Sequence, residues 1–86
     1  MKYEIERISK GGDFYIHYDR EFMAYAVNDL LCDALEERGA ISVHDVPEEN
    51  SEWHGMIYIQ VSEAVTADEL ARDIDGLIAE AKADQD

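Results

Sequence analysis

Alternating apolar and polar residues predict short strands at the start of the chain. Residues 3–8 and 14–18 are rich in aromatic and β-branched side chains. The segment between them contains Gly11 and Gly12, which permit the positive φ of a tight connection. These two runs therefore predict a β-hairpin.

The same pattern returns in the middle of the chain. Residues 40–46 and 55–62 predict two further strands, joined by the polar segment 47–54. Successive side chains of a strand point to opposite faces, so alternation assigns each residue to one face. We expect Phe14, Ile16, Tyr18, Ile57, Ile59 and Val61 to face the helices, and Tyr15, His17, Met56 and Tyr58 to form a half-apolar outer face.

Two longer segments predict helices. Asp19 is a suitable N-cap for a helix over 20–38, and Gly39 supplies a left-handed stop. Thr66 and Glu69 form a capping box for a second helix. The expected core stripes are Met23, Val27, Leu30, Leu31 and Ala34 in the first helix, and Leu70, Ile74, Leu77, Ile78 and Ala81 in the second.

The order of elements predicts an α+β fold of the ββαββα type. We expect a four-stranded, mainly antiparallel sheet with both helices on one face. Residues 1–86 are too few for more than one domain, and 83–86 are expected to fray.

The charge of the chain narrows the range of partners. There are 21 acidic and seven basic residues, a net charge of −14. Such a surface repels DNA, RNA and anionic membranes and favours a cationic partner. One cysteine and no apolar run of about 20 residues predict a soluble, cytoplasmic protein without disulfides or a membrane span.

Both predicted helices carry acids away from their core stripes. In the second helix these are Asp68, Glu69, Asp73, Asp75 and Glu80, and in the first they are Asp29, Asp33 and Glu36, together with Phe22, Tyr25 and Cys32. Aromatic residues among acids are typical of contact surfaces, so we expect partner binding here. The alternatives are a solvated face, and packing of Phe22 and Tyr25 into the core.

The polar segment between the second pair of strands holds the only tryptophan. Trp53 lies beside Glu52, Glu48 and Glu49. This segment is either a recognition tip or a loop whose tryptophan folds back over the sheet edge, and packing is slightly favoured.

Catalysis has little support in the sequence. His17, His44 and His54 are isolated from one another, and no catalytic, phosphate-binding or metal-binding motif occurs. A metal site built from His44, Asp45 and His54 is disfavoured. We therefore expect no catalytic residues, no cofactor and no metal.

In its small size and strong acidity, the chain resembles the phage-encoded inhibitors of bacterial defence, including anti-CRISPR proteins and other DNA mimics. The resemblance implies a mode of action in which carboxylates occupy a basic nucleic-acid groove of a partner, such as a CRISPR–Cas effector subunit of the bacterial host. It rests on no motif, so no residue role is carried over.

Two other functions fit the composition. The acidity can be an adaptation to high salt in a housekeeping domain, in which case it indicates no partner. The chain can also be a small oligomerising regulator or antitoxin-like module, forming a homodimer through the outer sheet face that carries Tyr15, His17, Met56 and Tyr58.

Overall fold

A computed structural model describes residues 1–8, 12–48, 52–61 and 65–85 as four strands and three helices. In chain order the elements are β1 (Tyr3–Arg7), β2 (Asp13–Tyr18), α1 (Arg20–Ala24), α2 (Val27–Glu37), β3 (Ser42–Pro47), β4 (Gly55–Gln60) and α3 (Ala67–Gln85).

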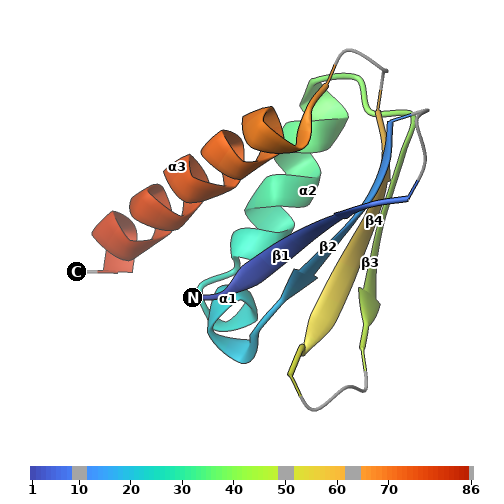
Figure 1. The fold of residues 1–86 in the computed structure, drawn as a ribbon. Helices are drawn as coiled ribbons and strands as arrows, with labels where there is room; N and C mark the ends of the chain where they lie inside the picture. Colours follow the sequence, from blue (N-terminus) through green and yellow to red (C-terminus); the bar gives the residue numbers. More distant parts are fainter. Residues whose placement is uncertain (9–11, 49–51, 62–64, 86) are drawn as a thin grey trace.

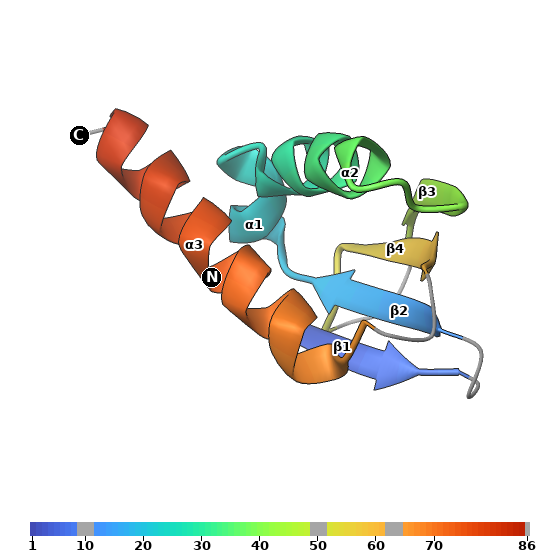
Figure 2. The same cartoon turned by 90° about the horizontal axis from the view of Figure 1, so that it is seen from above.

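The strands form an antiparallel sheet in the order β1-β2-β4-β3. The helices lie on one face of this sheet, with α2 beside β3 and β4 and with α3 crossing near β1 (Figure 1; Figure 2). The predicted α+β fold and its ββαββα order are confirmed.

The core lies between the helices and the inner face of the sheet. On the central strands Phe14 pairs with Ile59 and Ile16 with Ile57, and all four side chains are fully buried. Tyr18 and Val61 are also buried, so the predicted division of β2 and β4 into two faces is confirmed. The helices leave the opposite side of the sheet uncovered, and we call this side the outer face.

The first helix differs from the prediction because it is broken. The N-cap is as expected, since the Asp19 carboxylate accepts a hydrogen bond from the Phe22 amide at 2.9 Å. The helix then ends at Tyr25, and Ala26 adopts a left-handed φ of 59° before α2 begins. The left-handed conformation costs alanine about 1–2 kcal/mol, so an alanine is not a residue from which a helix break is expected. The local sequence therefore does not mark this position.

The break changes which residues face the core. Phe22 is fully buried, whereas Met23 and Leu30 are 42% and 40% exposed. The buried residues of α2 are Val27, Asn28, Leu31 and Leu35. The predicted core stripe is therefore wrong at Met23 and Leu30, because it assumed one continuous helix from 20 to 38.

The ends of α2 and α3 follow their predicted signals. Gly39 adopts a φ of 84° after α2, and the Glu69 amide donates to Thr66 Oγ1 at 3.2 Å at the start of α3. Leu70 and Ile74 are fully buried. The helix continues to Gln85, so residues 83–85 are helical where fraying was expected.

The first turn contains a glycine in the expected conformation. Gly12 has a positive φ, while Gly11 lies outside the described residues.

Within the described part of the chain, no helix is long and apolar enough to cross a membrane.

Candidate functional site

The outer face of the sheet carries a continuous row of aromatic rings. The ring centroids of His44 and Tyr58 lie 6.2 Å apart, and those of Tyr58 and Tyr15 lie 5.7 Å apart. The row continues from Tyr15 to His17 at 6.2 Å and from His17 to Trp53 at 6.0 Å. We call these five residues the ring row. All except His44 are half-buried, so the rings hold one another in place although no helix covers them.

His17, in the ring row, lies between two carboxylates. Its Nδ1 is 2.9 Å from Glu48 Oε2 and its Nε2 is 3.5 Å from Glu6 Oε2. Burial lowers the pKa of His17, but the hydrogen bonds and negative charges of Glu48 and Glu6 outweigh burial and raise it above its ordinary value. The positive form of this histidine is therefore favoured on the outer face.

Carboxylates accompany the ring row, whereas no lysine or arginine side chain of the described strands does. Alternation along β1 puts Glu4 and Glu6 on the outer face, and Glu48 approaches from the segment after β3. Arg7 is the only arginine or lysine in the described strands, and it lies on the helix side with its guanidinium 5.7 Å from the ring centroid of Phe14. The outer face thus combines rings with negative charge.

The acids predicted as a contact face on α3 divide into two groups. Asp73 accepts hydrogen bonds from both terminal nitrogens of Arg38 on α2, and Asp75 accepts one from the Tyr3 hydroxyl at 2.7 Å. Burial, together with Asp75, raises the pKa of Tyr3 to about 12. These two acids hold α3 to its neighbours. Asp68, Glu69 and Glu80 are exposed, as is Asp75.

In the structure, the aromatic residues and the acids that were predicted to share a surface on the first helix do not lie together. Phe22 is buried against Tyr18 with ring centroids 5.2 Å apart, and Tyr25 is half-buried against the core. The expectation that Phe22 contributes to a contact surface is therefore wrong. The predicted acids Asp29, Asp33 and Glu36 of α2 are exposed, as is Glu37. Aromatic residues and acids do occur together, but on the outer sheet face.

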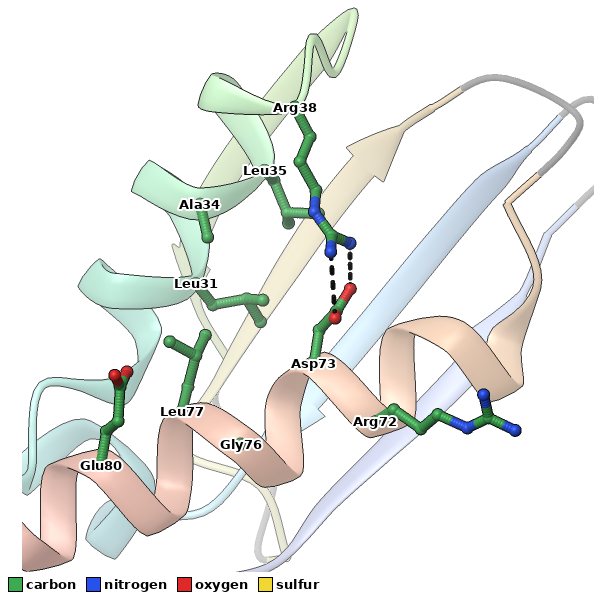
Figure 3. A pocket seen from close by; sticks show the side chains of 9 residues that line it. All are labelled: Leu31, Ala34, Leu35, Arg38, Arg72, Asp73, Gly76, Leu77 and Glu80. Carbon is green, nitrogen blue, oxygen red and sulfur yellow. Dashed lines mark hydrogen bonds and ion pairs between the residues drawn. The ribbon is translucent and has the colours of Figure 1, made fainter.

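A groove separates α2 from α3 (Figure 3). It encloses about 440 Å³, and its apolar wall is formed by Leu31, Ala34, Leu35 and Leu77. The Arg38–Asp73 ion pair spans it. Gly76 lines this groove too, and a Cβ added there would meet no atom within 4 Å. The two helices are therefore incompletely packed along their length.

A polar network joins β2, α2 and β3. Asp45 accepts hydrogen bonds from the Tyr18 hydroxyl at 2.5 Å and from the Asn28 amide at 2.7 Å. Asn28 Oδ1 is buried without a hydrogen-bond partner among the described residues. Burial, and then the charge of Asp45, raises the pKa of the Cys32 thiol to about 11. Near neutral pH this cysteine is a protonated thiol and a weak nucleophile.

The histidines do not gather into a metal site. His44 and Asp45 are consecutive in β3 and point to opposite faces, with His44 beside Tyr58 and Asp45 beside Tyr18. Within the parts of the chain that the structure describes, no three histidine, cysteine or acidic side chains are placed to hold one ion.

The sequence pattern identified only part of the outer face. It assigned Tyr15, His17, Met56 and Tyr58 to this face, but it did not connect them with Glu6, Glu48 and Trp53. Alternation along β1 was the available signal for Glu6. The contacts of Glu48 and Trp53 with His17 join residues that are distant in the sequence, so the local pattern did not indicate them.

The chain matches no protein-family model, no curated protein and no solved structure with which it was compared. Its function is therefore inferred from the geometry and charge of these surfaces.

Proposed function

We propose that the protein is a non-catalytic, acidic binding protein that blocks a basic nucleic-acid-binding surface of a partner protein, in the manner of an anti-CRISPR or DNA-mimic inhibitor. One observation supports this most directly. Exposed carboxylates stand on two neighbouring helices on the same side of the sheet: Asp29, Asp33 and Glu36 on α2, and Asp68, Glu69 and Glu80 on α3.

The helical placement of these acids favours binding because it fixes their spacing before a partner arrives. Duplex DNA carries about one charge per 1.7 Å of its axis, and a protein groove that neutralises this density attracts other ordered anionic surfaces. An acidic tail would have to be ordered on binding, which costs free energy. The packing of Leu70, Ile74 and Leu31 in the core holds both helices in place.

The net charge adds attraction at long range. A charge of −14 on 86 residues produces a negative field that accelerates encounter with a basic surface and weakens as salt increases. A bacterial defence complex such as a CRISPR–Cas effector offers a surface of this kind, because it must hold nucleic acid. Action by occupancy also requires no turnover.

The test uses a variant that removes charge while preserving packing. Asp73 and Asp75 are unsuitable, because they bond to Arg38 and Tyr3. Asp33→Asn, Glu36→Gln and Glu80→Gln together neutralise three exposed acids that lie outside the first turn of either helix. This triple variant should keep a cooperative melt near that of the parent, since none of the three side chains forms a hydrogen bond or ion pair with another described residue.

The measurement is capture from a bacterial lysate followed by a nucleic-acid competition assay. We expect a basic protein to be retained at low salt and released at high salt, and its nucleic-acid binding to be lost at one equivalent of the parent. The triple variant should bind it about tenfold or more weakly, roughly 1.4 kcal/mol or more. Equal retention of parent and variant across the salt titration would instead support a salt-adapted domain.

A further inference from the structure

We propose that the outer face of the sheet is an arginine-binding surface, which takes an arginine-rich segment of a protein partner. This proposal rests on the proposed function in one respect, namely that the partner carries positive charge. It goes further in naming a different face, opposite α2 and α3, and in naming the side chain that this face selects.

The ring row provides stacking surfaces for guanidinium groups. The planar, weakly hydrated guanidinium of arginine stacks on aromatic rings, whereas the compact lysine ammonium remains strongly hydrated. Tyr15, Tyr58 and Trp53 are half-buried, so their rings are ordered before binding and still reach solvent. Their contacts with His17 and with each other extend the apolar surface from β4 across β2.

Carboxylates beside the rings supply the charge that arginine requires. Glu4 is exposed on β1, and the side chain of Glu6 is 59% exposed. A carboxylate accepts two parallel N–H bonds from one guanidinium, a geometry that an ammonium does not match. The Glu6–His17 contact is long, at 3.5 Å, so an arginine can take the place of the histidine there.

Charge also distinguishes this partner from a second copy of the chain. A homodimer through the outer face would bring Glu4, Glu6 and Glu48 of each protomer against the same acids of the other. The Glu6 and Glu48 carboxylates outnumber His17, the histidine that lies between them. Arg7, the only arginine or lysine of the described strands, lies on the helix side. Like charges in close contact are unfavourable, so the face suits a cationic partner better than itself.

A partner groove can contact both sides of the domain. The protein measures 37 × 27 × 18 Å along its principal axes, and the helices lie on the side of the sheet opposite the outer face. A groove built around a nucleic acid lines more than one side of its ligand. The acids of α2 and α3 and the ring row can therefore meet opposite walls of one groove.

The experiment compares an arginine peptide with a lysine peptide of the same length and charge. Trp53 is the only tryptophan and belongs to the ring row, so its fluorescence reports directly on this face. We expect the arginine peptide to bind about tenfold more tightly at equal salt, because stacking and paired hydrogen bonds add to its charge. Amide NMR shifts should then concentrate on β1, β2 and β4.

Two variant pairs separate recognition from charge. Tyr15→Thr with Tyr58→Thr retains β propensity and should bring the two peptides to equal affinity. Glu4→Gln with Glu6→Gln should weaken arginine binding more than Asp33→Asn with Glu80→Gln, which changes the net charge equally on the helix side. The helix-side pair should lower both affinities together and leave their ratio unchanged.

Three results would overturn the proposal. These are equal affinity of the parent for both peptides, shifts that map to α2 and α3, and a dimer in sedimentation experiments that the tyrosine pair dissolves. None of them bears on whether the protein blocks a nucleic-acid-binding partner at one equivalent. Conversely, a selective arginine face without such a block would contradict only the proposed function.

Discussion

The two faces of the sheet are built from the same strands and are stabilised in different ways. On the helix side, Ile57 and Ile59 of β4 are fully buried. On the outer side, Met56 and Tyr58 of the same strand remain partly exposed beside histidine and carboxylate groups. One face is thus held by exclusion of water, while the other is held by ring contacts and hydrogen bonds that leave it open to a partner.

Neighbouring residues of β4 test this difference most strongly. Ile57→Ala should lower the free energy of unfolding by about 2–5 kcal/mol, because it leaves a cavity under the helices. Met56→Ala on the outer face should cost only about 1 kcal/mol, since part of that side chain is already hydrated. Chemical denaturation of both variants measures the contrast, and similar losses would mean that the outer face is packed as tightly as the core.

A glycine of β4 shows how closely the helix side is packed. Gly55 lies opposite Tyr18, and an added Cβ would overlap the tyrosine ring and hydroxyl. Gly55→Ala should therefore cost about 1–3 kcal/mol, since Tyr18 must move away from Asp45. In a Tyr18→Leu background the same change should cost less, and additive costs in this double-mutant cycle would show that the two positions are independent.

The groove between α2 and α3 predicts a change of opposite sign. Gly76→Ala should raise stability by about 0.5–1 kcal/mol, because alanine favours the helix and its Cβ meets no neighbour. Gly39→Ala is the matched control and should destabilise the protein, since Gly39 has a φ of 84°. A loss of stability on Gly76→Ala would mean that the helices approach more closely there.

The smallest expected effect concerns the titration of His17 on the outer face. Glu48→Gln should shift the pKa of His17 downward in an NMR titration, because the hydrogen bond to a charged carboxylate is lost. The raised folded-state pKa stabilises the parent fully below about pH 6.5, and this contribution disappears as pH rises through the folded value. The stability curves of parent and variant should therefore converge at alkaline pH, and a constant difference would exclude this linkage.

Several elements were predictable because their signals are local. The N-cap at Asp19, the capping box at Thr66 and the left-handed Gly39 depend on a few neighbouring residues. Alternation along β2 and β4 likewise identified both faces of the sheet, since it depends only on strand geometry. The break at Ala26 has no such signal, so the exposure of Met23 and Leu30 was missed, and the burial of Phe22 was expected only as an alternative.

For this protein, the sequence by itself determined the order of elements, the two faces of the central strands and the strongly negative charge. Only the tertiary structure decided which of the helix acids bond to a residue of another element. Asp73 and Asp75 bond to Arg38 and Tyr3, which are distant in the sequence. The outer face depends on the same kind of contact, since Glu48, which directly follows the edge strand β3, reaches past β4 to His17 in β2. The periods of helices and strands can be recognised from neighbouring residues, because they follow from local backbone geometry. The pairing of side chains that are far apart in the chain depends instead on how the elements pack.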